Sequence, residues 1–426
     1  MAKITPDDCV LKRGSLPFFW LGDTCWSAFT NMTDAEWQDY IIKRAAQGFN
    51  VVQVNALPQW DRCGSTLGLY PFPTQDGLHF TYDGTLNEAY FARAGRMAAF
   101  AAHHGITLAV AVQWCNYVPG TWAAAKHPEN ILPAAMVEPV VKKICETFSA
   151  YDPVFLISGD ADFETKEALQ RYLWVTRLVQ KFAPDAPLAY HLKGWSDALP
   201  QELAEYAALY LYQSGHNPAY QYTARTLAES FRARLPQKPV LNSEPCYEQM
   251  GYSRLAYGRH RQEDCRRILW TSLLSGACAG ITYGTHGVWN WYKPGMPENP
   301  VSGEGFLQAP LCTAALGLPG AEDFAFARQL CEGWGRWDFT PCPEVLLAYR
   351  KEIPAARSGA RTVLYLPTAA PLPLAEPLSV QKIYFIDLET RKALQAHCLY
   401  KAGVLHLEQA PCYRDALLII EGESPC

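Results

Sequence analysis

The sequence predicts an α/β fold, in which a (β/α)8 TIM barrel is followed by a small antiparallel β-sandwich. One observation is a recurring unit, an amphipathic helix followed by a short apolar run, which indicates a parallel sheet with crossover helices. Another is an asymmetry of loop length, because connections that enter these runs are short whereas several that leave them are long. The last is a change to closely spaced short strands near the C-terminus.

Eight apolar runs are the expected barrel strands, and they cover residues 18–22, 51–55, 107–112, 154–158, 188–191, 209–212, 240–242 and 281–284. The first helix is marked by a capping box at Thr33 and Glu36, an apolar stripe that includes Trp37 and Tyr40, and a stop at Gly48. The longest loops that leave strands are 58–86, 114–132 and 285–311. In a (β/α)8 barrel such loops line the C-terminal face, where active sites lie.

The pattern changes after a helix expected over 321–332. Short strands are expected at 345–350, 361–366, 383–388, 404–407 and 416–420, with turns between them. We therefore assign residues 1–338 to the barrel and residues 339–426 to a β-sandwich accessory domain, which is an ordinary domain size. Since no row of aromatic residues marks this region, we expect it to brace the barrel.

Composition and charge exclude several partners. The chain has 426 residues, 49% of them hydrophobic, and a formal net charge of −5. No Lys/Arg cluster suits a phosphate backbone, so nucleic acid is not an expected partner. No segment is apolar over the length of a membrane span and the charged N-terminus does not resemble a signal peptide, so no membrane partner is expected. The 14 cysteines form no Cys-x-x-Cys pair, which favours reduced thiols in the cytoplasm.

Polar and aromatic side chains that follow the expected strands are the candidate substrate-binding residues. Because the carboxyl ends of barrel strands converge, we expect these side chains to line one pocket. Flat aromatic rings among them suit the apolar faces of a sugar. The candidates are Asp23, Trp26, Gln53, Asn55, Gln113, Trp114, His191, Tyr212, Gln213, Tyr247, Glu248, His286 and Trp289, and Trp291 is a further stacking candidate.

Two carboxylates directly follow strongly apolar runs, Asp160 after the fourth strand and Glu244 after the seventh. Cleavage of a glycosidic bond needs one carboxyl group to protonate the leaving oxygen and another to attack the anomeric carbon or to activate water. In a retaining enzyme Glu244 would be the nucleophile and Asp160 the acid/base. The structural alternatives are that Asp160 caps the following helix and that Glu244 pairs with a buried cation.

Metal and cofactor motifs are not found in the sequence. There is no His-x-His after the first strand, no paired histidines on a helix and no Gly-rich phosphate loop. The alternation of Asp160, Asp162 and Glu164 lacks the central Gly and the distal Glu of a calcium loop. We therefore expect neither a metal nor a cofactor, and we expect a small carbohydrate or glycoside as the substrate.

Four segments together resemble the apiosidase-like glycoside hydrolases: 17–26 (PFFWLGDTCW), 44–53 (RAAQGFNVVQ), 158–160 (SGD) and 238–248 (KPVLNSEPCYE). The resemblance covers the whole barrel, and Ser158 departs from it where another Gly is expected. It implies a retaining, exo-acting glycosidase with Asp160 as acid/base and Glu244 as nucleophile. The family's reference substrate is a terminal apiose, so the resemblance implies apiose or another furanose.

Two other classes of function stay open on the sequence alone. A metal-dependent barrel hydrolase or lyase would lose activity to a chelator. A non-catalytic carbohydrate-binding protein would bind sugar without turning it over. The scarcity of clustered histidines argues against the first, and retention of both carboxylates argues against the second.

Overall fold

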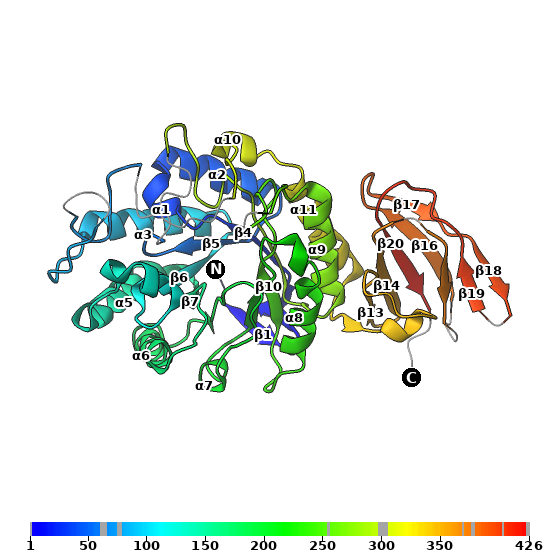
Figure 1. The fold of residues 1–426 in the computed structure, drawn as a ribbon, viewed down its shortest axis with the longest axis horizontal. Helices are drawn as coiled ribbons and strands as arrows, with labels where there is room; N and C mark the ends of the chain where they lie inside the picture. Colours follow the sequence, from blue (N-terminus) through cyan, green and yellow to red (C-terminus); the bar gives the residue numbers. More distant parts are fainter. Residues whose placement is uncertain are drawn as a thin grey trace.

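The computed structural model describes residues 2–59, 66–74, 79–253, 256–296, 306–368, 370–375, 380–402 and 404–422. The chain folds into a barrel of parallel strands surrounded by helices, with two antiparallel sheets beside it at the C-terminal end (Figure 1). The predicted fold class is thereby confirmed. No helix in the described ranges is long and apolar enough to cross a membrane.

Eight parallel strands form a nearly closed barrel in the order β8-β7-β6-β5-β4-β11-β10-β9. The seam between β8 and β9 is joined by two backbone hydrogen bonds, from Ala208 N to Leu188 O (2.7 Å) and from Trp195 N to Gln213 O (2.9 Å). The strands are β4 (Trp20–Thr24), β5 (Val51–Asn55), β6 (Thr107–Trp114), β7 (Val154–Gly159), β8 (Leu188–Ala189), β9 (Tyr210–Gln213), β10 (Val240–Glu244) and β11 (Gly280–Tyr283).

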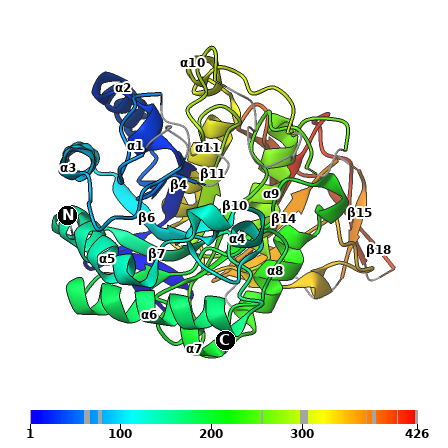
Figure 2. The same ribbon diagram turned by 60° about the vertical axis from the view of Figure 1, so that its left-hand side comes forward.

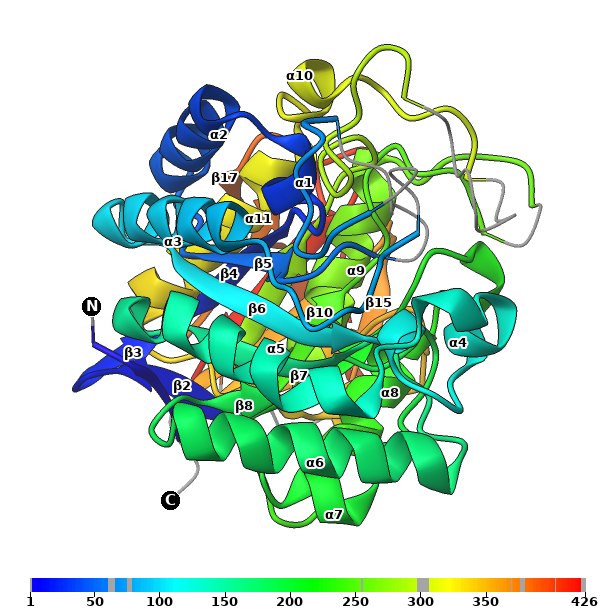
Figure 3. The same ribbon diagram turned by 90° about the vertical axis from the view of Figure 1, so that its left-hand side faces the viewer.

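Helices cover the outside of the barrel, and Figures 2 and 3 show α3, α5 and α6 on the side that faces away from the C-terminal sheets. The predicted capping box is present at the start of α2, with Glu36 N donating to Thr33 Oγ1 and Thr33 N donating to Glu36 Oε2. The helices are α1 (Ala28–Asn31), α2 (Asp34–Ala46), α3 (Glu88–His103), α4 (Trp122–Lys126), α5 (Ala134–Phe148), α6 (Lys166–Phe182), α7 (Gln201–Ala204), α8 (Thr223–Arg232), α9 (Gln262–Leu274), α10 (Cys312–Ala315) and α11 (Gly320–Trp334).

A three-stranded antiparallel sheet precedes the barrel, formed by β1 (Ile4–Asp7), β2 (Val10–Arg13) and β3 (Leu16–Phe18). The sequence prediction did not separate this sheet from the first barrel strand. Phe18 was assigned to that strand, but it pairs with Leu11 in the N-terminal sheet, and the barrel strand begins two residues later at Trp20. Both segments are apolar, so hydrophobicity alone does not show the boundary between them.

The C-terminal region contains a six-stranded sheet in the order β12-β13-β14-β20-β16-β17 and a three-stranded sheet in the order β15-β19-β18. Predicted strands at 361–366 and 404–407 match β14 and β19, and those at 383–388 and 416–420 match β16 and β20 within one residue. The strands are β12 (Thr340–Pro341), β13 (Ala355–Ser358), β14 (Arg361–Leu366), β15 (Leu372–Leu374), β16 (Lys382–Asp387), β17 (Lys392–Gln395), β18 (Cys398–Lys401), β19 (Val404–Leu407) and β20 (Ala416–Glu421).

The strand predicted at 345–350 is wrong. A 3-10 turn occupies Pro343–Val345, and the segment after it leaves Leu347 and Tyr349 more than half exposed. Pro343, the first residue of this turn, has no backbone N–H group and so cannot donate a hydrogen bond to a neighbouring strand. The short strands β17 and β18 were missed because most of their side chains are exposed, so their sequences show no alternation of buried and exposed residues.

Candidate active site

The pleat of the strands decides which predicted site residues face the barrel interior. Side chains alternate between the two faces of a strand, so every second residue points inward. Gln53 points inward from β5, where its amide donates to Ser243 O (2.9 Å) and accepts from Thr282 Oγ1 (3.2 Å). Thr282 lies on β11 and Ser243 on β10, so the amide links β5 to two strands beyond its neighbour β4.

Glu244 ends β10, where a register shift between Asn242 and Glu244 re-aims the strand. Its carboxylate lies between two imidazoles: Oε1 is 3.0 Å from Nε2 of His216, and Oε2 is 3.2 Å from Nε2 of His191. His216 follows β9 and His191 follows β8, so three consecutive strands of the barrel supply this cluster. We call the two imidazoles the histidine clamp.

Backbone N–H groups fix the tautomer of both histidines in the clamp. Asp160 N donates to Nδ1 of His191 (3.2 Å), and Tyr247 N donates to Nδ1 of His216 (3.4 Å). A neutral imidazole that accepts at Nδ1 carries its proton at Nε2. Each Nε2–H therefore faces a different oxygen of Glu244.

The clamp keeps Glu244 ionised. The carboxylate is only 7% exposed, and burial by itself raises the pKa of a carboxyl group. The hydrogen bond with His216 (3.0 Å) and the close contact with His191 (3.2 Å) outweigh that penalty and lower the pKa of Glu244 from 4.5 to about 2. Burial and the neighbouring charge of Glu244 raise the pKa of Tyr247 well above its ordinary value, so its hydroxyl stays neutral and accepts from Trp26 Nε1 (3.1 Å). Glu244 is thus a largely buried anion at neutral pH.

Asp160 directly follows β7 and has a left-handed backbone with φ of 52°. Non-glycine residues hold this conformation only where their surroundings impose it, and such residues cluster at functional sites. The indole of Trp122 donates to Asp160 O (2.9 Å), and Asp160 N donates to His191. Both backbone groups of Asp160 are therefore tied to the residues around the site. Asp160 lines the cavity and does not cap α6, whose N-cap is Thr165.

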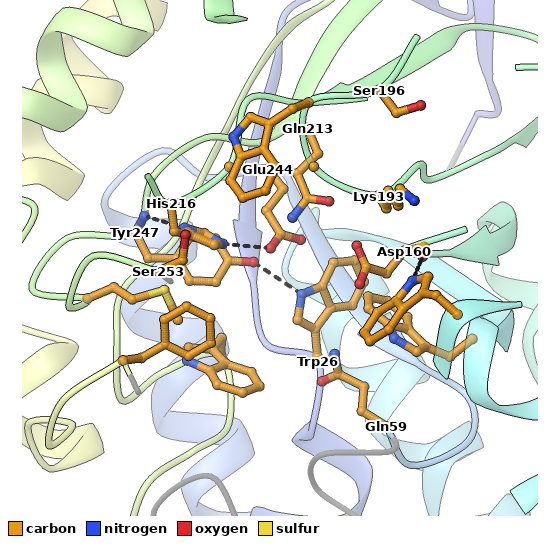
Figure 4. A pocket seen from close by; sticks show the side chains of 18 of the residues that line it. Trp26, Gln59, Asp160, Lys193, Ser196, Gln213, His216, Glu244, Tyr247 and Ser253 are labelled. Carbon is orange, nitrogen blue, oxygen red and sulfur yellow. Dashed lines mark hydrogen bonds and ion pairs between the residues drawn. The ribbon is translucent and has the colours of Figure 1, made fainter. Parts of the chain in front are cut away.

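A cavity of about 660 Å³ contains both carboxylates, a size within the range of small-ligand sites. Figure 4 shows Glu244 between the pair His216 and Tyr247 on one side and Asp160 on the other. Of the predicted residues, the structure brings together Trp26, Trp114, Asp160, Gln213, Glu244, Tyr247 and Trp289 as cavity-lining side chains.

Three predicted substrate contacts face away from the cavity. Asp23 points outward from β4 to α2, where it accepts from Arg44 Nε (2.6 Å) and Tyr40 Oη (2.8 Å). Tyr212 points outward from β9 to α8 and donates to Ala224 O (2.8 Å). Both lie on the outward side of the pleat, so proximity to a strand end was a misleading signal.

The third is Glu248, which lies one turn beyond the end of β10 and is 1% exposed. It accepts from Tyr283 Oη (2.5 Å) and from Gly320 N (2.9 Å), the first residue of α11. Burial raises the pKa of this carboxyl group. Glu248 thus joins the start of α11 to the barrel and does not reach the cavity.

The other predicted contacts are buried close to the barrel core. His191 contacts Glu244 and is fully buried. Asn55 and Gln113 point into the barrel, and within the described ranges their amide atoms have no hydrogen-bond partner in the protein. His286 is 2% exposed and does not line the cavity, and Trp291 packs edge-on against Tyr40 (5.8 Å between ring centroids) in the core.

Several lining residues were missed, and most belong to loops that leave strands. They are Gln59, Trp122, Lys126, Trp195, Ser196, Asp197, Met250, Ser253 and Phe306. Gln59, Trp122, Lys126 and Phe306 fall in the long loops 58–86, 114–132 and 285–311, whose length was the available signal. Parts of the first and third loops lie outside the described residues.

No group of three or more His, Cys, Asp or Glu side chains in the described ranges is arranged to hold a metal ion. The acidic residues after β7 are paired with a cation instead. Lys193 Nζ lies 3.4 Å from Asp162 and 2.9 Å from Glu164, both by carboxylate oxygens.

Fold and site together define a class of protein. A parallel (β/α)8 barrel with an acidic pair and a wall of aromatic rings at the C-terminal ends of its strands has the arrangement of a glycoside hydrolase. Solved structures share the whole fold. A glycoside hydrolase is 19% identical, with 100% of this chain and 98% of that chain covered and a TM-score of 0.83. A family 5 glycoside hydrolase from Bacteroides vulgatus is 18% identical, with coverage of 99% and 93% and a TM-score of 0.81.

Residues 8–338 match the family described as the apiosidase-like catalytic domain. The chain belongs to the apiosidase-like family, which confirms the resemblance found in the sequence, and it is a glycoside hydrolase. No curated protein matches it.

Proposed function

We propose that the protein is a retaining, exo-acting glycoside hydrolase that removes a terminal sugar, apiose or another furanose, from an oligosaccharide or glycoside. The observation that carries the proposal is the Glu244 carboxylate, held ionised between His191 and His216 on the wall of a cavity that Asp160 also lines. The sugar class follows from the family description, apiosidase-like.

In the first step Asp160 donates its proton to the glycosidic oxygen while Glu244 attacks the anomeric carbon. The clamp suits this role because it lowers the pKa of the nucleophile and so prevents its protonation at neutral pH. A covalent glycosyl-enzyme forms, and the aglycone leaves with the proton of Asp160.

In the second step Asp160 takes a proton from water, which attacks the anomeric carbon and releases Glu244. The two displacements restore the original anomeric configuration. Trp26, Trp114 and Trp289 line the cavity and offer ring faces to the apolar side of the sugar. Trp122 lines it too, and its tie to Asp160 O restricts the acid/base.

Cysteine chemistry supports a cytoplasmic location. The described ranges contain twelve cysteines, and all are free thiols. Ten of these are buried, which fits a protein folded in a reducing compartment.

The test is release of free sugar from a panel of aryl and natural glycosides, apiosides included, by wild type, Glu244→Ala and Asp160→Ala in EDTA. We expect turnover by wild type and a loss of about a thousandfold or more in each variant. Glu167→Gln, which removes an exposed carboxylate from the first turn of α6, is the matched control and should leave turnover unchanged.

The anomeric configuration of the first-formed product decides the stereochemistry, because retention requires a double displacement. An inverted product would overturn the nucleophile role of Glu244. Loss of activity on chelation would instead favour the metal-dependent class, and sugar binding without turnover would favour a binding protein.

A further inference from the structure

A second, smaller cavity lies between the loops that follow β9 and β10 and the start of α9. Its volume is about 30 Å³, room for roughly two water-sized molecules. Cys246, Tyr252, His260, Asp264 and Arg267 are among its lining residues. Nothing in the proposed hydrolysis uses this cavity.

Two thiols meet at this cavity. Cys246 comes two residues after Glu244, and Cys265 lies in the first turn of α9. Their Sγ atoms are 3.8 Å apart, and Cys265 Sγ also lies 3.5 Å from Cys246 O. Cys246 reaches the cavity, whereas Cys265 is fully buried behind it.

The surroundings make Cys246 the reactive partner. The contact with the Cys265 thiol and the neighbouring His260 together outweigh burial and hold the pKa of the Cys246 thiol well below its ordinary value. The same contact and burial raise the pKa of Cys265. Since the thiolate is the nucleophilic form, Cys246 attacks first and Cys265 follows as the resolving thiol.

We infer that Cys246 and Cys265 form a peroxide-oxidisable dithiol whose oxidation disables the sugar site. The Cys246 thiolate attacks one oxygen of hydrogen peroxide, so that an S–O bond forms, the O–O bond breaks and hydroxide leaves as water after taking a proton. Cys265 then attacks the sulfenic sulfur, an S–S bond forms, the S–O bond breaks and a second water leaves with the proton of Cys265. Two thiols lose two electrons in total, and one peroxide is reduced to two waters.

Formation of the disulfide would displace groups that contact Glu244, because the loop that carries Cys246 is hydrogen-bonded to the histidine clamp. An S–S bond is about 2.05 Å long, so the two sulfurs must approach by nearly half their present separation. The loop that carries Cys246 also carries Tyr247, whose N–H holds His216, and Gly215 N donates to Glu244 O (3.2 Å). His260, beside Cys246, lies 2.8 Å from His216 O by its Nε2. A shift of this loop therefore moves the clamp relative to the nucleophile.

A second thiol pair provides a matched control. Cys9 lies in the turn between β1 and β2, and its thiol is hydrogen-bonded to that of Cys278, which precedes β11. This pair is at the N-terminal end of the barrel strands, the end opposite the sugar site. Its oxidation has no comparable route to Glu244.

The test is peptide mapping of the whole protein after treatment with hydrogen peroxide, with wild type, Cys265→Ser and Cys278→Ser compared. In wild type and Cys278→Ser we expect a peptide linked through Cys246 and Cys265 that a dithiol reductant releases. In Cys265→Ser we expect Cys246 as a sulfenic acid that dimedone traps. Recovery of Cys246 as a free thiol, while the Cys9–Cys278 pair is oxidised, would overturn the inference.

The effect on turnover rests on the proposed function and has its own readout. We expect glycosidase activity to fall about tenfold or more as the linked peptide forms, and to recover on reduction, because displacements near 1 Å at a reacting group cost about a hundredfold. Full activity in the disulfide-linked protein would show that oxidation does not regulate the sugar site, although the two thiols do form a disulfide. Absence of activity in the untreated enzyme would contradict the proposed function alone, because the mapping needs no substrate.

Discussion

At the end of β10, Glu244 keeps its negative charge although it is largely buried, because two imidazole N–H groups face its two oxygens. Neither histidine follows the nucleophile in the sequence. They come from the ends of β8 and β9, and backbone N–H groups from residues 160 and 247 orient them. A single residue's chemistry thus depends on three neighbouring strands.

His216→Ala removes the N–H group that lies 3.0 Å from Glu244 Oε1. The pKa of Glu244 should rise from about 2 toward its ordinary value of 4.5. Because the carboxylate is the reactive form, activity falls as the pH drops through this pKa, so the acidic limb of kcat/KM should move to higher pH by about one unit or more. His216→Gln restores a donor and should move the limb back. If wild type and His216→Ala gave the same pH profile, the imidazole of His216 would not be what keeps Glu244 ionised.

Position 159, directly before Asp160, requires glycine because the ring of Trp114 occupies the space that a side chain would need. A Cβ atom at this position would lie 1.9 Å from the Trp114 ring. Gly159→Ala should therefore displace Trp114 from the cavity, raise KM for the sugar substrate and reduce the free energy of unfolding by about 2 kcal/mol. Gly95→Ala in α3, where a Cβ meets its nearest atoms at 3.7 Å, is the control and should be neutral or slightly stabilising in the same denaturant titration.

At the scale of elements, the periodicity of the sequence predicts where strands and helices lie, and the loop lengths predict which end carries the site. It was harder to predict from the sequence which side chains of each strand face the barrel interior. Gln53 and Asp23 stand at similar places on neighbouring strands, yet one faces the barrel interior and the other faces α2. All five residues of β4 are buried, so the pattern of hydrophobicity does not show which face of this strand Asp23 occupies.

Side-chain contacts between residues that are far apart in the sequence could not be predicted either. The contact of His216 with Glu244 spans 28 residues and depends on the register between β9 and β10. The lining residues Trp195 and Phe306 come from loops that carry no motif. Loop length signals that such residues exist and does not say which side chains turn inward.

Asp23 separates a structural role from a substrate contact, because it joins β4 to α2 through Arg44 and both side chains are fully buried. Asp23→Asn leaves the guanidinium without a compensating charge and should reduce the free energy of unfolding by about 3 to 5 kcal/mol, with little change in KM. The double variant Asp23→Leu/Arg44→Met should recover much of that stability. Urea denaturation and steady-state kinetics on the same samples distinguish the two roles of Asp23. A raised KM with an unchanged free energy of unfolding would show that Asp23 contacts the substrate.

At the scale of the whole molecule, the barrel and the C-terminal sheets share one apolar core. Leu21 and Leu269 of the barrel belong to the same buried cluster as Val363, Leu417 and Ile419 of the six-stranded sheet. The interface contains a buried charge cluster. Arg266 of α9 binds both oxygens of Asp415 (2.6 and 2.8 Å) and one oxygen of Asp323 in α11 (3.0 Å). Shared core and shared charges predict that the two parts unfold together.

Asp415→Asn tests that coupling. The substitution keeps the shape of the side chain but removes the charge that Arg266 and Tyr365 contact, so a buried guanidinium keeps only Asp323 as its anionic partner. We expect a loss of about 3 kcal/mol in the free energy of unfolding and a single calorimetric transition that moves as a whole to lower temperature. Glu389→Gln, which removes an exposed ion pair with Arg414 on the same sheet, should change stability by less than about 1 kcal/mol. Two separated transitions in wild type would mean that the C-terminal sheets do not brace the barrel, and the sugar site would then be expected to survive their removal.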